Sequence, residues 1–146
     1  MRVERTFNLD IIKSIVEHPE LRDLLTEDGE VVHVPSHPDI YWLLSYNKDI
    51  LRGFVGFIPI NSITWNPHIA ILPEFRGCGT DTMYAGIQWM FQNTPCQKIV
   101  AYPPGYNKAM IRVFEKCGLH REGLSPDSFM FRGKVYDRIL MGIERS

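Results

Sequence analysis

The sequence predicts a single domain of mixed α/β class, and three observations support this. The chain has 146 residues, which fits one domain and is long enough to bury a core. Hydrophobic residues make up 45% and charged residues 23%, as in an ordinary globular protein. Strand-like and helical patterns alternate in the order strand, two helices, three strands, helix, strand, helix and two strands. With no internal repeat or linker, we expect residues 1–146 to form one domain.

The N-terminal region begins with a short strand and continues into helices. Residues 1–7, "MRVERTF", alternate an apolar side chain with charged neighbours, which is typical of a strand. A helix follows, capped by Asn8 and ended before Pro19. Its apolar face comprises Leu9, Ile12 and Val16. A second, shorter helix is indicated by Leu21, Leu24 and Leu25. The next stretch is mostly loop, with an extended piece at residues 31–34.

Three strands rich in aromatic and branched residues follow, at residues 40–47, 50–60 and 62–72. The first two are separated only by a tight polar connection, so we expect them to pair antiparallel. Pro67 lies in the third strand. Because proline has no N–H to donate to a sheet, we expect a bulge or an interruption at this residue.

The second half of the chain predicts two more helices and three more strands. The first helix follows the glycine-containing residues 72–80, and its apolar stripe ends at "NTP". The stripe comprises Met83, Tyr84, Ile87, Met90 and Phe91. Residues 98–102, "KIVAY", are typical of a short strand inside a sheet. The second helix spans residues 106–118, and Gly118 is placed for a left-handed cap. Its inward residues are Met110, Val113, Phe114 and Cys117. Two strands joined by a turn at Arg132 and Gly133 complete the order.

Charge and composition exclude several classes of protein. A formal net charge of −1 and a pI of about 6.5 argue against a strongly basic nucleic-acid binder. Cys78, Cys96 and Cys117 form no C-x-x-C pair, and the histidines lack metal-ligand spacing, so we expect neither disulfides nor a metal. The N-terminus lacks the apolar run of a signal peptide, and no segment is long enough to cross a membrane. We therefore expect a cytoplasmic protein with neither nucleic acid nor membrane as partner.

The stretch "FRGCGT" places two glycines beside an arginine at the start of a helix. The first turn of a helix presents unpaired N–H groups and a partial positive charge, which suit a phosphate. Without side chains, Gly77 and Gly79 would let a pyrophosphate reach the backbone. The patterns of a P-loop and of a dinucleotide fold are both absent. On its own, the loop is equally compatible with a structural turn.

Two linked motifs point to a family. "LPEFRGCG", followed further along the chain by "NKAMIRVFEKCGLHREG", resembles the GNAT superfamily of acyl-CoA N-acyltransferases. The C-terminal stretch looks most like the branch that modifies ribosomal proteins and polyamines, and the resemblance covers roughly residue 40 onward. It implies a GNAT-like fold, in which a mostly antiparallel, twisted central sheet of about seven strands contains one splayed parallel pair. About four helices would flank this sheet.

The resemblance also implies a set of residues that bind acetyl-CoA. The pyrophosphate would be wrapped by Arg76, Gly77, Cys78, Gly79 and Thr80. The end of the third central strand, with Ile69, Ile71 and Leu72, would offer backbone groups to the pantetheine amides. Asn107 would hydrogen-bond the pantetheine arm where the two parallel strands splay apart.

Acyl transfer to a primary amine has a proton requirement, because the amine has a pKa near 10 and must lose a proton before it attacks. His68 is a candidate base by residue type, although a packed or surface histidine is the plainer interpretation. Tyr102 and Tyr106 flank "PPG" at the mouth of the expected splay and are candidate acids or simply wall residues. Asp137 could orient an amine or be a solvated strand residue.

We therefore predict an N-acetyltransferase that moves an acetyl group from acetyl-CoA to a primary amine of an unidentified acceptor by direct attack. The alternative is a catalytically degenerate GNAT-fold protein that binds acyl-CoA or assembles with other proteins. Several departures from the family pattern motivate it: Asp81 and Thr80 in the loop, and Phe114 and Met110 where members carry a tyrosine or a serine. A homodimer is left open as the quaternary state.

Overall fold

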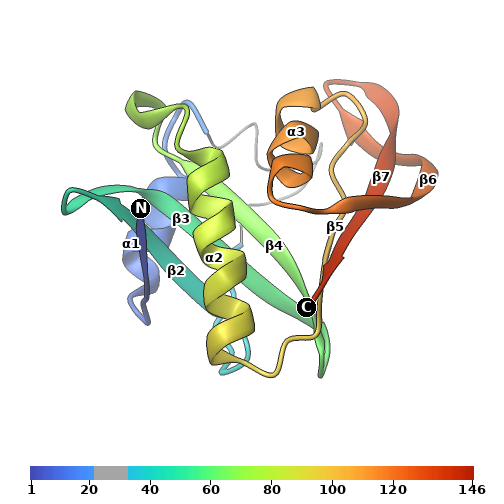
Figure 1. Cartoon of the computed structure of the whole chain (residues 1–146). Coiled ribbons are helices and arrows are strands. Elements are labelled where there is room, and N and C mark those ends of the chain that lie inside the picture. Colours follow the sequence, from blue (N-terminus) through green and yellow to red (C-terminus); the bar gives the residue numbers. More distant parts are fainter. Residues whose placement is uncertain (22–32) are drawn as a thin grey trace.

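A computed structural model describes residues 1–21 and 33–146, in which three α-helices flank one seven-stranded sheet (Figure 1). The strands are β1 (Arg2–Arg5), β2 (Tyr41–Asn47), β3 (Ile50–Asn61), β4 (Thr64–Ile71), β5 (Lys98–Ala101), β6 (His120–Phe131) and β7 (Lys134–Glu144). The helices are α1 (Leu9–Val16), α2 (Gly79–Asn93) and α3 (Lys108–Lys116), with a short 3-10 turn η2 (Pro73–Phe75) before α2. Among these helices none is long and apolar enough to span a membrane.

The sheet has the order β1-β2-β3-β4-β5-β7-β6, and every neighbouring pair is antiparallel except β4 and β5. This confirms the predicted fold class, the number of strands and the single parallel pair. The second helix predicted from Leu21, Leu24 and Leu25 falls mostly outside the described residues, as does the first half of the extended piece at residues 31–34. Of that piece, His33 and Val34 are described and lie in no strand.

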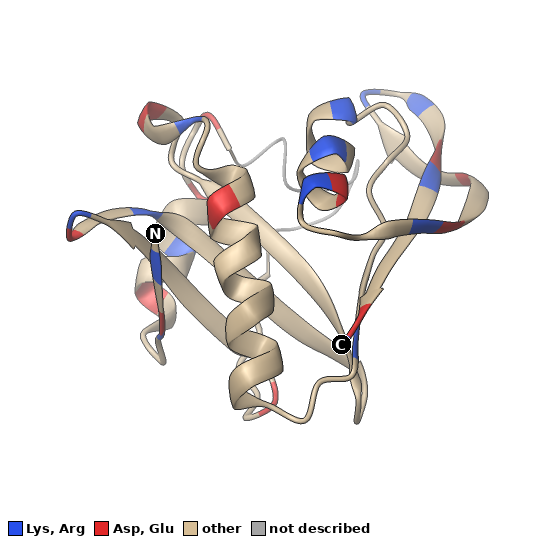
Figure 2. Ribbon diagram, viewed as in Figure 1, with Lys and Arg blue, Asp and Glu red and all other residues tan. Residues whose placement is uncertain are grey.

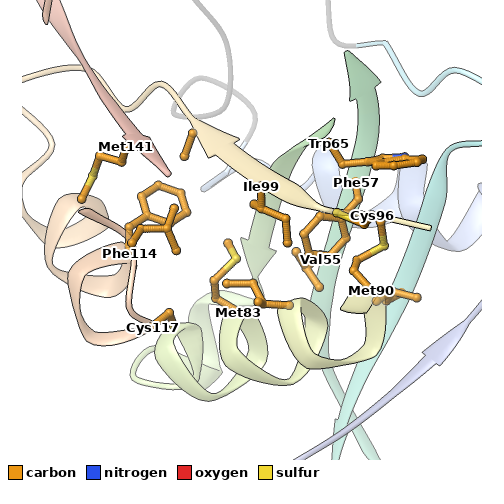
Figure 3. Packing of buried hydrophobic residues seen from close by; sticks show 14 of the residues in the cluster. Val55, Phe57, Trp65, Met83, Met90, Cys96, Ile99, Phe114, Cys117 and Met141 are labelled. Carbon is orange, nitrogen blue, oxygen red and sulfur yellow. The ribbon is translucent and has the colours of Figure 1, made fainter. Parts of the chain in front are cut away.

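Helices cover both faces of the sheet, because its strands alternate two sets of apolar side chains. On one face Leu43 and Val55 pack with α2 and α3, and on the other Trp42 and Phe54 pack with α1. Figure 3 shows the first of these clusters, where Met83 of α2 lies near the strands and the buried residues of α3. The two faces are therefore separately packed layers with the sheet between them.

Small residues on helix α2 let it lie closer to the sheet than the large apolar side chains predicted for its buried face would allow. Its buried positions are Thr82, Met83, Gly86, Ile87 and Met90. A Cβ on Gly86 would come within 2.6 Å of Val55, so the missing side chain lets the helix approach β3. The Thr82 hydroxyl hydrogen-bonds the buried hydroxyl of Ser45 at 2.8 Å. Because these small residues turn inward, the prediction that Tyr84 belongs to the buried stripe was wrong, and Tyr84 is 55% exposed.

Several local predictions are confirmed by backbone geometry. Asn8 caps α1 by accepting a hydrogen bond from the N–H of Asp10 at 3.1 Å. Gly118 ends α3 with a φ of +96°, as a left-handed cap requires. Arg132 and Gly133 form the predicted turn between β6 and β7, both with positive φ. On α3 the predicted Phe114 and Cys117 are buried, and Ile111, which was not predicted, joins them.

The parallel pair β4 and β5 is joined over only two residue pairs, Thr64 with Lys98 and Trp65 with Ile99. The Lys98 N–H donates to the carbonyl of residue 63 at 3.1 Å, and a parallel ladder repeats every second residue. The same repeat would next join the Pro67 N–H to the Val100 carbonyl, but proline has no N–H. The Asn66 side-chain amide instead donates to that carbonyl at 2.8 Å. The ladder stops there, and the two strands diverge (Figure 1).

The bulge expected at Pro67 is not where the sheet is irregular. Pro67 stays in register with Phe57 of β3, and the shift in the β3–β4 register falls between Pro59 and Asn61. Pro67 occupies a position whose N–H would point away from β3, because the hydrogen-bonded pairing with β3 falls on the alternate residues of β4. The proline therefore leaves the antiparallel ladder intact and interrupts only the parallel one.

We predict that Asn66→Ala destabilises the protein by about 1–3 kcal/mol, because the Val100 carbonyl loses the donor that replaces the missing proline N–H. Denaturant unfolding would measure the loss. The matched control is Gln92→Ala, which removes an amide from an exposed position of α2 and should change stability by less than about 0.5 kcal/mol. Equal stability of the two variants would contradict the role given to Asn66.

Candidate functional site

A cavity of about 510 Å³ opens where β4 and β5 diverge. Residues 66–69 of β4 form one wall, and residues 101–104 at the end of β5 form the other. Phe114 of α3 lines it from one face of the sheet, and Trp42 and Phe54 line it from the face that α1 covers. The cavity therefore connects the two faces of the sheet through the gap between the parallel strands.

The three candidate catalytic residues, His68, Tyr102 and Tyr106, all line this cavity. His68 is exposed, and strand alternation places it with the buried Ala70 on the α1 face. Tyr102 directly follows β5 and is 39% exposed. Tyr106 packs by its ring, stacked on Phe131 with centroids 5.1 Å apart. The tertiary structure thus brings together residues from two separate segments of the chain, strand β4 and the connection between β5 and α3.

The backbone at the end of β4 is oriented toward the gap. The Leu72 N–H donates to the Arg52 carbonyl of β3 at 2.9 Å, so alternate residues of β4 face β3. By the same alternation, the backbone groups of Ile69 and Ile71 point to the side that β5 has left. Leu72 differs from them, because its carbonyl also accepts a hydrogen bond, from the N–H of Phe75 at 2.9 Å.

Asn107 lies at the mouth of the cavity and begins α3. Its side-chain oxygen accepts a hydrogen bond from the Met110 N–H at 3.1 Å, which caps the helix. The amide nitrogen of the same side chain is a donor on the cavity wall. One residue can therefore hold the helix start and still offer an N–H group to a ligand.

The start of α2 is open. Its first backbone hydrogen bond runs from the Thr82 N–H to the Cys78 carbonyl at 3.0 Å, so the N–H groups of residues 79–81 have no acceptor within the helix. Cys78 gives no side-chain cap, whereas α1 and α3 are both capped by asparagine. A Cβ at Gly77 would meet nothing within 4 Å, and one at Gly79 would lie 3.8 Å from Val113. The N–H groups at this helix start, with Gly77 and Gly79, form an open seat that fits an anion. The protein's own side chains do not fill this seat.

Charges of both signs surround this seat. Arg76 is 75% exposed and pairs with Glu20 at 3.3 Å. Asp81 lies exposed in the first turn of α2. Figure 2 shows Lys and Arg along the adjacent α3, where Lys108, Arg112 and Lys116 repeat every four residues. These cations lie on the helix that meets Gly79 through Val113, so they add positive charge on the α3 side of the seat.

Two features that raised doubt about catalysis have clear structural positions. Phe114 and Met110 both line the cavity, and neither side chain can transfer a proton.

Burial, and then the nearby charge of Asp81, raise the pKa of the Cys117 thiol to about 11. Its Sγ donates to the Thr80 carbonyl at 3.5 Å, so the thiol is a protonated core group.

Sequence reasoning missed Arg138, whose side chain lines the cavity beside Tyr102 with its Cζ 6.0 Å from the ring centroid. The alternation of residues along β7 shows which face of the sheet a residue occupies. It does not show that this face borders the gap between β4 and β5, because those strands are distant from β7 in the sequence.

Asp137, weighed as an orienting residue, is exposed and accepts a hydrogen bond from the Asp127 N–H at 2.9 Å. In the described part of the chain, no cluster of His, Cys, Asp and Glu could hold a metal ion.

Comparisons with known proteins agree with the fold of this chain. The model of the acetyltransferase (GNAT) domain matches residues 18–120, which is more than two thirds of the chain. No curated protein matches the chain.

Solved structures with the same fold include spermidine N-acetyltransferase from Vibrio cholerae in complex with CoA and spermine. It is 18% identical over 98% of this chain and 94% of that chain, with a TM-score of 0.81. A GNAT-family acetyltransferase from Bacillus anthracis is 20% identical over 72% of this chain and 65% of that one, with a TM-score of 0.62. The match to the family model, together with the predicted motifs and this fold, shows that the chain belongs to the GNAT family of acetyl-CoA-dependent N-acetyltransferases.

Proposed function

We propose that the chain, acting as one domain, binds acetyl-CoA along the open start of α2 and transfers the acetyl group inside the cavity to a primary amine. The observation that carries the proposal is that α3 links the two parts of the site. Val113 of α3 lies next to Gly79 at the uncapped start of α2, and Met110 and Phe114 of the same helix line the cavity, which passes between β4 and β5 to the opposite face. Donor and acceptor can therefore approach each other from opposite sides of the sheet.

In this proposal the donor is held mostly by the backbone. The N–H groups of Gly77, Gly79 and Thr80 would bind the pyrophosphate, with charge from Arg76. Cys78 lies in the same loop, but its N–H already donates to the Phe75 carbonyl at 3.2 Å. Ile69 and Ile71 would pair with the pantetheine amides as β5 would have done, and the amide nitrogen of Asn107 would donate from the other wall. Leu72 would contribute only its side chain, because its own backbone groups are already bonded.

The chemistry requires two proton movements. The amine nitrogen attacks the thioester carbon after it has lost a proton, the carbon–sulfur bond breaks, and the departing thiolate takes up a proton. His68, exposed on the α1 face, would accept the amine proton. Tyr102 and Tyr106 are the two phenols of the described lining and are the candidates for the acid. Positioning in the cavity supplies much of the remaining acceleration.

We also propose the cytoplasm as the location. Cys78, Cys96 and Cys117 are all free thiols, which fits a reducing compartment.

We predict that Gly79→Glu abolishes stabilisation by CoA while the fold is retained, because the new carboxylate occupies the pyrophosphate seat from an open position. Thermal melting measures this: CoA at 100 times its dissociation constant should stabilise the parent protein by about 2.7 kcal/mol and the variant not at all. Gln92→Glu adds the same charge at an exposed site of the same helix and should keep the full effect. A persistent CoA effect in Gly79→Glu would show that the seat lies elsewhere.

Asp81→Ala should tighten CoA binding about two- to fivefold at low salt, because it removes a negative charge from the first turn that receives the pyrophosphate. Calorimetric titration would measure the affinity, and added salt should shrink the difference between the two proteins. Weaker binding by the variant would mean that the helix start needs the carboxylate of Asp81 more than it is harmed by its charge.

His68→Gln, Tyr102→Phe and Tyr106→Phe separate proton transfer from wall packing. Loss of a group that moves a proton should lower kcat by roughly 10²–10⁴-fold with CoA affinity unchanged. The two phenylalanine variants keep the ring, so a tyrosine that only packs should leave kcat unaltered. If CoA binds but no amine in a broad panel releases its thiol, the chain is an acyl-CoA binder that does not catalyse transfer.

A further inference from the structure

Arg138 is a cation of the cavity that the transfer chemistry above does not use. It lies on β7, where it forms an isolated bridge with Pro104 just beyond the end of β5. Its Nε donates to the Ser128 hydroxyl at 3.2 Å. No carboxylate in the described residues pairs with its guanidinium, and its two terminal nitrogens make no hydrogen bond with them. A permanently charged, planar donor pair is therefore available at the cavity wall.

The face of the sheet on which Arg138 lies follows from the strand pairing. Met141 pairs with Ala101, and both pack in the cluster that contains Phe114 of α3. Ile139 packs against the same cluster, so alternation along β7 places Arg138 on the opposite face. That is the face of His68, from which the acceptor enters, and not the face on which α2 receives the pyrophosphate.

The rest of this end of the cavity is aromatic or basic. Its apolar walls include Trp42, Phe54 and Phe129, and its polar groups include the side chains of His33 and His68. No Asp or Glu belongs to the lining among the described residues. A polycationic amine would meet a guanidinium that no carboxylate of the described residues neutralises, which is repulsive, whereas a carboxylate matches the guanidinium in charge and in two-pronged geometry.

We propose that the acceptor is an aminocarboxylate with an apolar body, such as an apolar amino acid, and that Arg138 binds its carboxylate while the amine points into the gap between β4 and β5. This rests on the proposed function, because it names the acceptor of the same site. Arg138 determines specificity through binding, and the reacting amine and thioester remain with the residues already described.

The test uses matched acceptors and the whole chain. Alanine, valine, leucine and phenylalanine are compared with their carboxamides and with spermidine, by thiol release from acetyl-CoA. The carboxamides lack the negative charge, and a larger share of their amine is unprotonated. Because the unprotonated amine is the form that attacks, this difference favours the carboxamides. Any preference for the acids must therefore come from binding. At least one acid should exceed its carboxamide in kcat/KM by about 10- to 100-fold.

Arg138→Gln should remove this preference by lowering kcat/KM for the acid about 10- to 100-fold, while the carboxamide is unaffected. Arg138→Lys should restore part of it, because the charge returns without the planar fork. Arg121→Gln removes an exposed arginine of β6 outside the lining and is the matched control, which should behave as the parent. Stabilisation by CoA should be the same in all four proteins.

Four results would overturn the proposal: a preference for spermidine, a preference for carboxamides, an acid preference that survives Arg138→Gln, or loss of CoA binding in that variant. If no amine is acetylated although CoA stabilises the protein, the proposed transfer function fails by itself. The acceptor inference is then decided by melting of the CoA-bound protein. Acids that stabilise the parent more than their carboxamides, but not Arg138→Gln, support it, and equal stabilisation refutes it.

Discussion

The missing N–H of Pro67 is the constraint on which the rest of the site depends. Two parallel strands would ordinarily continue to pair, and nothing would fit between them. Here the pairing of β4 and β5 ends after Trp65 and Ile99, at the rung where the proline would have to donate. Asn66 satisfies the Val100 carbonyl that this rung leaves without its backbone partner, so the interruption leaves no orphaned acceptor there. The gap is thus a stable feature of the sheet rather than a defect in it.

At the end of the gap where β4 and β5 still pair, side chains connect the surrounding elements. The Arg145 guanidinium, carried just beyond β7, donates to the carbonyls of Phe91, Thr94 and Cys96 and so ties the end of α2 to the start of β5. Lys98 joins Glu122 and Glu144 across the neighbouring strands. With α2 also seated on β3 at Gly86, the uncapped start of the helix is held in a fixed position relative to the cavity. Such preorganisation of a binding site reduces the entropy lost when a ligand is bound.

The two faces of the sheet have different chemistry, which suits a reaction between two partners. On the α3 face the site offers backbone N–H groups and the start of a helix, which would bind phosphate and amide groups through the main chain in the proposed function. On the α1 face it offers side chains, including His68 and Arg138, and aromatic walls. Main-chain recognition depends on the fold, whereas side-chain recognition can change one residue at a time. Likeness in fold to spermidine N-acetyltransferases therefore does not determine the acceptor of this chain.

What the sequence by itself determined about this protein was set by local physics: the periodicity of strands and helices, the cap at Asn8, the left-handed Gly118, the turn at Arg132 and Gly133, and the glycine loop that marked the family. These depend on residues close together in the chain, so their patterns are visible without a fold. Only the tertiary structure decided the rest. It turned Tyr84 to solvent because Thr82 and Gly86 suit the closer approach to β3, and it directed the effect of Pro67 to the parallel ladder. It also brought Arg138 beside Tyr102, since contacts between distant strands follow from pairing order and register, which no local pattern contains.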